Sequence, residues 1–524
     1  MNKKVIMTWM LALTMGSVCQ AEDITIRYNG ATAKVEQKAK DSVNVTVEGA
    51  RVSIVSQYTA HKLSVRLTGK SDDGQLMLKT AGKATVTLDK LNLTSQEGAP
   101  LDLRNKKKVE VAVANGTENT LCIAACNDTA NNKAATIWAK DKILLSGKGT
   151  LNVIATGDGC RGIKSKDDIT IEDVTLNVTT SGNHLGEKPF SFGGFPGFGE
   201  GEMPDFGNFP MPDFGNFPMP EGGNFQMPEG GFPNFGGFPG FGGFDAPADS
   251  TRQGGFPGFG GFGGFGGFGN ADGENEDGEE GGGFGGFGGK HKYVSSTKGI
   301  ASKGKVIINS GNVTVRTTTD GAEGIEGKEG VIVNGGKVDV MTTDDAINAN
   351  ATIEFNGGVV IARSKGNDAV DSNPKGGFFM PFGGNNNQED ADPAIVITGG
   401  TVYAWSQVGS PEEGLDCDFA PLVIEGGTIF TVGGGMGEMP SVPTNYTSKQ
   451  PSALLIGLNV VKDEPIYLYD NKNKLIETIT VPFSMRRSAS LVSSAAFQVG
   501  ETYTVKTKDY EKTFTLSENF TAVR

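Results

Sequence analysis

Acidic side chains recur at fixed positions in a short phrase that repeats along the chain. The phrase reads Gly-Ile-Glu-Gly-Lys at 324–328, Ala-Ile-Asn-Ala-Asn at 346–350, Ala-Val-Asp-Ser-Asn at 369–373 and Gly-Leu-Asp-Cys-Asp at 414–418. Carboxylates stand two positions before its central apolar residue, and carboxylates or an amide stand one position after it. They are Glu323, Glu326, Asp345, Asp368, Asp371, Glu413 and Asp416. An oxygen-only set of this kind is what calcium prefers, and no cluster of His or Cys in the sequence suggests zinc.

Stacking of the repeats would bring like charges close together. Carboxylates about 5 Å apart repel by about 3 kcal/mol at an effective dielectric constant near 20. We therefore expect a bound cation or partial protonation, unless the columns are splayed turns that face water. The same positions are basic in earlier repeats, at Arg161, Lys164 and Lys298, so calcium is not expected there.

The spacing of the phrase predicts the elements that position these residues. Its central residue steps from Ile325 to Ile347 to Val370, and each step also contains a β-branched run, a Gly-Gly or similar turn and an alternating strand. Repeats of short strands and glycine turns with this period are typical of solenoids. We predict an all-β fold, a right-handed parallel β-helix, with about three strands in each repeat.

A second candidate site lies on the strand after the Gly-Gly turn. Its outward positions would stack Tyr403 on Phe430, beside Arg316, Arg363 and Trp405. Flat aromatic rings next to guanidinium groups suit the apolar face, hydroxyls or carboxylate of a sugar. The alternative is that a terminal region or a loop folds over these aromatic side chains.

Composition limits the partners and the compartment. The formal net charge of −14 disfavours nucleic acid and anionic membranes. Residues 1–21 resemble a secretory signal peptide, with Cys19 as an alternative lipidation site, so we expect a secreted, periplasmic or cell-surface protein. Four cysteines remain after residue 21. We expect Cys417 to be a buried free thiol, and a disulfide among Cys122, Cys126 and Cys160 is possible.

The chain divides into an organised part and a low-complexity part. We expect the following segments: a signal peptide (1–21), an N-terminal β cap (22–80), β-helix (81–185), a disordered Gly/Phe/Pro-rich insertion (186–290), β-helix (291–439) and a C-terminal β cap (440–524). The insertion has too few Val, Ile and Leu residues to form a core.

The repeats resemble a family of secreted bacterial carbohydrate-binding β-helix proteins related to the pectate-lyase superfamily. The resemblance rests on Gly-Ile-Lys-Ser-Lys-Asp-Asp-Ile-Thr-Ile, Gly-Ile-Glu-Gly-Lys-Glu-Gly-Val-Ile-Val-Asn-Gly-Gly, Ala-Trp-Ser-Gln-Val-Gly and the run Asn115 to Leu121. It covers roughly 22–185 and 291–524. It implies a right-handed parallel β-helix, calcium at the seven acidic positions, and binding of cellulose or acidic, pectin-like glycans without cleavage.

We therefore expect a calcium-stabilised polysaccharide-binding protein, and assign no catalytic residues. Two alternatives remain open. One is a calcium-dependent polysaccharide lyase that uses Arg316 or Arg363 as its base. The other is a surface or matrix protein that works through the Gly/Phe-rich segment.

Overall fold

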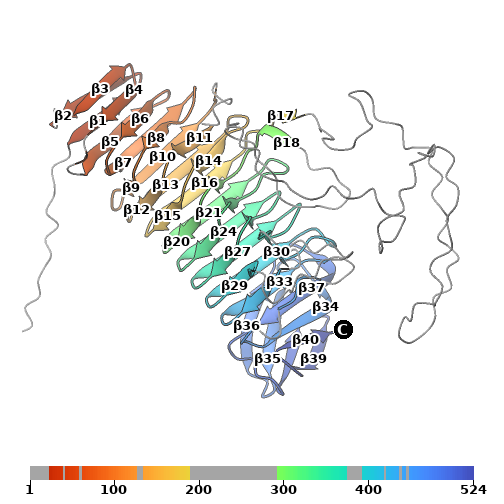
Figure 1. Ribbon diagram of the computed structural model, residues 1–524. Coiled ribbons are helices and arrows are strands. Elements are labelled where there is room, and N and C mark those ends of the chain that lie inside the picture. Colours follow the sequence, from red (N-terminus) through yellow and green to blue (C-terminus); the bar gives the residue numbers. More distant parts are fainter. Residues whose placement is uncertain are drawn as a thin grey trace, which may run out of the picture. The chain divides into compact units, whose positions relative to one another are not determined.

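The computed structural model describes residues 23–38, 42–57, 59, 62–126, 134–188, 292–374, 392–417, 420–435, 440–443 and 448–524. Within them the regular structure is β-strand alone, and parallel pairing predominates (Figure 1). No helix in these ranges is long and apolar enough to cross a membrane. The predicted signal peptide, almost all of the Gly/Phe-rich insertion and residues 375–391 lie outside the described residues.

Each repeat contributes three strands. The repeat that begins at residue 325 contains β22 (Ile325–Gly327), β23 (Val331–Val333) and β24 (Lys337–Thr342). The next contains β25 (Ile347–Ala349), β26 (Ile353–Phe355) and β27 (Val359–Ser364). All three pairs are parallel, with Ile325 opposite Ile347. The predicted stacking of successive repeats is therefore confirmed.

The first strand of each repeat lies in an 11-stranded sheet, and the other two lie in a 23-stranded sheet. The 11-stranded sheet contains β3 (Val43–Glu48), β4 (Arg51–Ser56), β6 (Gln75–Thr80), β8 (Leu101–Asn105), β11 (Ala135–Ala139), β14 (Arg161–Ser165), β19 (Ile300–Ser302), β22, β25, β28 (Val370–Ser372) and β31 (Leu415–Asp416).

The larger sheet has two parallel ladders, which meet at β7 (Ala84–Ser95). The first half of β7 pairs with β9 (Val109–Val113) and its second half pairs with β10 (Glu118–Ile123). The short-strand ladder contains β9, β12 (Ile143–Ser146), β15 (Ile169–Glu172), β20 (Val306–Ile308), β23, β26, β29 (Ile395–Ile397) and β32 (Leu422–Ile424). The long-strand ladder contains β5 (Leu63–Ser71), β7, β10, β13 (Thr150–Ala155), β16 (Thr175–Thr180), β21 (Asn312–Thr317), β24, β27, β30 (Thr401–Ser406) and β33 (Thr428–Val432).

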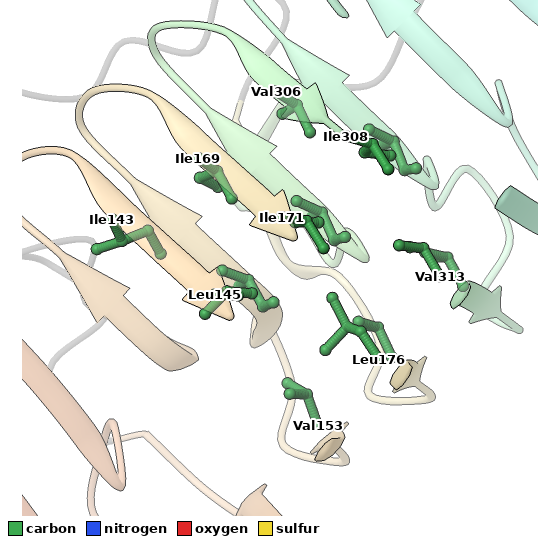
Figure 2. Packing of buried hydrophobic residues seen from close by; sticks show 14 of the residues in the cluster. Ile143, Leu145, Val153, Ile169, Ile171, Leu176, Val306, Ile308 and Val313 are labelled. Carbon is green, nitrogen blue, oxygen red and sulfur yellow. The ribbon is translucent and has the colours of Figure 1, made fainter. Parts of the chain in front are cut away.

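Alternate side chains of every ladder fill one continuous core. The short strands are buried at their first and third positions, as in Ile169 and Ile171 of β15. Leu176 and Val313 point into the same interior from the long-strand ladder (Figure 2). The β-branched alternation noted in the sequence thus supplies the apolar lining on which each repeat rests.

The turn between the two ladders requires glycine and is held by a column of amides. The second glycine of the Gly-Gly turn has a positive φ, 80° at Gly336 and 78° at Gly358, a conformation that L-residues rarely adopt. Beside it, the Asn334 amide donates to Asn309 Oδ1 (2.8 Å) and the Asn356 amide donates to Asn334 Oδ1 (3.0 Å). Equivalent side chains of consecutive repeats therefore contact one another.

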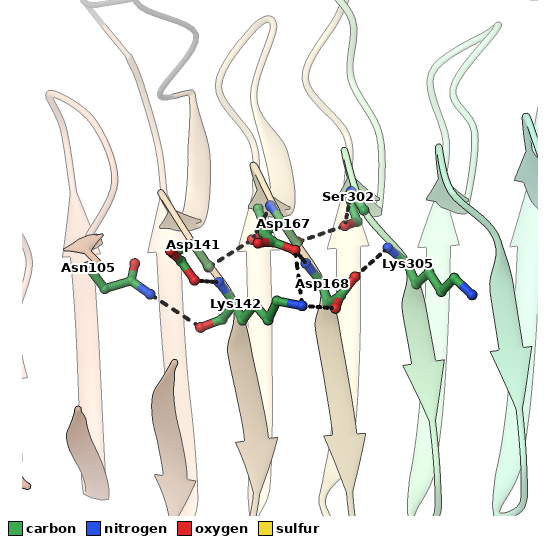
Figure 3. Close-up of polar contacts among 9 residues, drawn as sticks. Asn105, Asp141, Lys142, Asp167, Asp168, Ser302 and Lys305 are labelled. Carbon is green, nitrogen blue, oxygen red and sulfur yellow. Dashed lines mark hydrogen bonds and ion pairs between the residues drawn. The ribbon is translucent and has the colours of Figure 1, made fainter. Parts of the chain in front are cut away.

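The corner between the 11-stranded sheet and the short-strand ladder carries a chain of polar contacts (Figure 3). The Lys142 ammonium pairs with Asp168 at 2.7 Å, and the backbone N–H of Lys305 donates to the other carboxylate oxygen of Asp168 at 2.9 Å. The Ser302 hydroxyl donates to the backbone oxygen of Asp167. These contacts link successive repeats before the acidic columns begin.

Both ends of the described stack are built differently from its middle. The hairpins of β1 (Ile24–Asn29) with β2 (Thr32–Gln37) and of β3 with β4 begin the two sheets. Parallel pairing already begins at β1, which pairs with β5, and at β4, which pairs with β6, so the parallel stack includes strands before residue 81. At the other end, β34 (Ser452–Val460), β37 (Met485–Ser493) and β40 (Phe520–Val523) extend the 23-stranded sheet.

Candidate functional site

The strand register places the acidic residues in two columns on the 11-stranded sheet. In the first column, the residue after each member donates its backbone N–H to the carbonyl oxygen of the next member, as Gly324 N–H does to Asp345 O. Strand pairing aligns the second column. Column 1 is Arg161, Lys298, Glu323, Asp345, Asp368 and Glu413. Column 2 is Lys164, Ala301, Glu326, Asn348, Asp371 and Asp416. Their side chains contact one another, so the two columns lie side by side.

Lysines neutralise the first acidic pair. The Lys298 ammonium lies 3.1 Å from Glu323 Oε2 and 2.8 Å from Glu326 Oε1, and Lys328 lies 2.5 Å from the same Glu326 oxygen. Burial acts to raise the pKa of Glu326, but the two ammonium groups overcome it and hold that pKa at about 2. Burial, opposed by Lys298 and reinforced by Glu326 and Asp344, raises the pKa of Glu323 to about 7.

The next carboxylates are buried and share one amide. The Asn348 Nδ2 group donates to Asp345 Oδ2 at 2.8 Å and to Asp371 Oδ2 at 3.1 Å. Asp345 is 2% exposed, and its other oxygen, Oδ1, has no hydrogen-bond partner. Among the described residues no basic side chain forms an ion pair with Asp345 or Asp368. Burial and the neighbouring carboxylates raise the pKa of both groups well above the usual range.

Backbone N–H groups contact the last two carboxylates of column 1, Asp368 and Glu413. The N–H of Ser441 donates to Glu413 Oε2 at 2.7 Å, and the N–H of Glu413 donates to Asp368 Oδ1.

Cys417, next to Asp416, is buried and free, as the sequence predicted. Cys122 and Cys160 are also free thiols in this structure. Burial, and after it the negative charge of Asp416 and Glu413, raises the pKa of the Cys417 thiol.

The structure thus divides the seven predicted metal ligands into three groups. Glu323 and Glu326 have lysine partners. Asp345 and Asp371 contact Asn348, and Asp368 follows Asp345 in column 1. Glu413 and Asp416 end the columns. Within the described ranges no three His, Cys, Asp or Glu side chains converge as a metal site requires. The set that does converge is two carboxylates, Asp345 and Asp371, with the Asn348 amide.

Column 2 extends further toward the N-terminus than the sequence indicated. Pairing places Trp138 beside Lys164, and Asp102 beside Trp138. Both side chains are buried. The signal was present as Ile-Trp-Ala-Lys at 137–140, which matches Ile-Lys-Ser-Lys at 163–166 when the apolar residues are aligned.

The predicted aromatic platform is not an exposed surface. Phe430 and Trp405 are 1% and 4% exposed, because they pack with Leu455, Ile466 and other side chains of the C-terminal region. Tyr403 stacks on Trp405 with ring centroids 5.6 Å apart. The prediction of an open sugar platform on this ladder is corrected, and the alternative, a terminal region folded over the aromatic rings, is what the structure contains.

Two further predicted sugar ligands are already paired. Arg316 and Arg363 both form ion pairs with Asp339 Oδ1, the former at 2.8 Å. They lie on the long-strand ladder, whereas the acidic columns lie on the 11-stranded sheet. For either arginine to act as a base, its guanidinium group would first have to leave the Asp339 carboxylate.

Both ring nitrogens of His184, the histidine within the described residues, are hydrogen-bonded to backbone groups. His184 Nδ1 accepts a hydrogen bond from the Thr297 N–H at 3.1 Å, so its Nε2 donates to the backbone oxygen of Asp320 at 2.7 Å. Burial lowers its pKa below the usual range. His61 and His291 lie outside the described residues.

Part of the chain matches a family of known proteins. Residues 48–188 and 270–369 match the family described as "Carbohydrate-binding domain-containing protein". These two stretches resemble a carbohydrate-binding domain. A protein of the same description from Acetivibrio thermocellus is 27% identical over 151 residues, 28% of this chain. The chain spans about half, 50%, of the length of that relative.

A comparison with solved structures found the polysaccharide lyase-like protein from C. thermocellum, determined as a gadolinium derivative. The alignment covers 65% of this chain and 90% of that one, with 16% identity and a TM-score of 0.36.

Proposed function

We propose that this chain is an exported, calcium-stabilised carbohydrate-binding protein on a right-handed parallel β-helix, which recognises plant-type or acidic polysaccharide without cleaving it. One observation carries the proposal: Asp345 and Asp368 are buried next to stacked parallel strands without a basic partner among the described residues, within a segment that matches a carbohydrate-binding domain. The short leader-like run at 1–21 supports export.

Calcium suits the oxygen donors around Asn348. Asp345, Asp371 and the Asn348 amide would hold the ion, and the unpartnered Asp345 Oδ1 is a free acceptor for it. The Asn348 amide would turn so that its oxygen rather than its nitrogen faces the ion. A bound calcium ion would neutralise the carboxylates and offer coordination positions to the oxygens of an acidic sugar.

The proposal is tested by affinity gel electrophoresis in polygalacturonate, cellulose derivatives and neutral glycans, with and without a chelator. We expect calcium-dependent retardation in polygalacturonate, lost in the double variant Asp345→Asn/Asp371→Asn. Glu425→Gln is the matched control, because Glu425 is an exposed carboxylate with a surface lysine partner. Unchanged mobility of the wild-type protein in every gel, or no calcium in the purified protein by metal analysis, would contradict the proposal.

The lyase alternative receives less support from the site. Its candidate bases, Arg316 and Arg363, both pair with Asp339 and lie on a different sheet from the acidic columns. An assay for unsaturated products by ultraviolet absorbance separates the two functions. The Gly/Phe-rich alternative concerns a segment outside the described residues.

A further inference from the structure

The C-terminal region contains a separate four-stranded antiparallel sheet. Its strand order is β36, β35, β38 and β39, with bounds Leu475–Thr480, Pro465–Asp470, Thr502–Lys506 and Glu511–Thr515. One face is apolar and buried: Ile466, Leu468 and Val505 pack in the cluster that contains Trp405 and Phe430. The alternation of the strands leaves the opposite face turned away from this core.

Two tyrosines occupy the centre of that outer face. Tyr467 and Tyr469 alternate with the buried Ile466 and Leu468 on β35, and both are partly exposed. Their ring centroids are 6.1 Å apart and their planes differ by 33°. This separation is close to the length of one sugar unit in a linear chain, so consecutive units can each lie over one ring.

A threonine hydroxyl lies beside each of the two rings. In the cross-strand register Tyr467 lies between Thr478 and Lys506, and Tyr469 lies between Leu475 and Thr504. Threonines also form pairs between β38 and β39: Thr504 Oγ1 is 3.0 Å from Thr513 Oγ1, and Thr502 Oγ1 is 2.9 Å from Thr515 Oγ1. Each paired hydroxyl retains lone pairs for an outside hydrogen bond.

The face is close to electrically neutral. Its lysine, Lys506, lies opposite Glu511 and forms an ion pair with it at 2.9 Å. A face without an excess of positive charge does not suit nucleic acid or a polyanionic glycan. Aromatic rings with a border of hydroxyls instead match a sugar ring, which has an apolar C–H face and a rim of hydroxyl groups.

We propose that the outer face of this sheet, with Tyr467 and Tyr469 at its centre, binds a neutral polysaccharide chain laid along β35. The inference rests on the proposed function only in taking the ligand to be carbohydrate, since it places a second surface far in sequence from the acidic columns. Binding here needs no metal ion, whereas binding at the acidic columns depends on calcium.

The test compares wild-type protein with Tyr467→Thr/Tyr469→Thr, which removes both rings but keeps residues that favour strands. Tyr467→Phe/Tyr469→Phe keeps the rings, and Val47→Thr is a control at an exposed apolar residue of β3. Binding is measured by pull-down on insoluble cellulose and by affinity electrophoresis in a neutral soluble β-glucan, with and without a chelator. Circular dichroism melts establish that each variant is folded.

We expect the threonine variant to bind neutral glycan about tenfold more weakly or worse, and the phenylalanine variant and the control to stay within about threefold of wild type. The chelator should not change these results. Wild-type binding of neutral glycan that survives in the folded threonine variant overturns the inference, and so does a wild-type protein that binds no neutral glycan.

The two proposals fail independently. Calcium-dependent binding of polygalacturonate without binding of neutral glycan would retain the acidic columns and reject the tyrosine face. Chelator-resistant binding of neutral glycan that requires the tyrosine rings, with no binding of polygalacturonate, would do the reverse.

Discussion

Asp345 combines three properties that rarely occur together in one side chain: near-complete burial, neighbouring carboxylates and an oxygen without a hydrogen-bond partner. Desolvation and like charge both disfavour its ionised form. A group in this state either holds a proton or accompanies a cation. Its behaviour as the pH changes therefore reports directly on the acidic columns.

We predict an unusual pH dependence in the presence of a chelator. Burial, then Asp371, Asp344 and Glu323, raises the pKa of Asp345 in the folded state above its unfolded value. The folded state then binds more protons, so stability is full below the unfolded pKa and falls as the pH rises through the folded pKa. Thermal melts of wild-type protein should give a higher Tm near pH 5 than near pH 8, and added calcium should reduce the difference.

Asp345→Asn isolates the contribution of this residue. It should raise the Tm by a few degrees at pH 8 in chelator and change it little at pH 5, whereas Glu425→Gln should follow wild type at both values. A wild-type protein and an Asp345→Asn variant with parallel pH profiles would show that Asp345 is ionised and satisfied without calcium.

Lys298 has the opposite role, because it compensates two buried carboxylates at once. Lys298→Met should destabilise the fold by about 3–5 kcal/mol, since it leaves Glu323 and Glu326 without their shared partner. Urea denaturation measures the loss. The triple variant Lys298→Met/Glu323→Gln/Glu326→Gln should recover most of it, and an unrecovered loss would mean that Lys298 stabilises through packing rather than charge.

At the scale of the element, the Gly-Gly turn limits what each repeat can contain. Gly358 has a φ of 78°, and a Cβ there would lie 2.4 Å from Gly336 O. Gly457 has a φ of 85°, and a Cβ added to it would have no neighbouring atom within 4 Å. We predict that Gly457→Ala costs about 1–2 kcal/mol from backbone strain and that Gly358→Ala costs clearly more. Equal losses in urea denaturation would show that the neighbouring repeat moves aside freely.

The repeated phrase around Ile325, Ile347 and Val370 explains which elements could be predicted from the sequence. Ile325, Ile347 and Val370 align in the sequence and pair in the sheet, so the two columns followed from counting residues. Trp138 was missed because its repeat has Thr136 where the aligned repeats have Gly or Ala. The burial of Trp405 could not be predicted from the repeat, because side chains of the C-terminal region, such as Leu455 and Ile466, pack in the same cluster, and periodicity carries no information about such contacts.

At the scale of the whole molecule, the parallel stack continues directly across the long insertion. β16 pairs with β21 and β14 pairs with β19, although the chain between them includes residues 189–291. The two ends of the insertion are themselves joined, because β17 (Leu185–Lys188) pairs antiparallel with β18 (Lys292–Ser295). Its exit and return points are therefore fixed by described strands.

We predict that residues 190–290 can be replaced by an Asn-Gly turn without loss of stability. The two strands already form a hairpin, for which Asn-Gly is a favoured connection, and a shorter connection has a smaller entropic cost of closure. The Tm should stay within about 2 °C of wild type or rise. Deletion of 450–524 is the contrasting variant, because it uncovers Phe430, Trp405 and the edge of β33, and it should aggregate. A large destabilisation by the first deletion, with glycan binding also lost, would instead assign the Gly/Phe-rich segment a part in the folded structure.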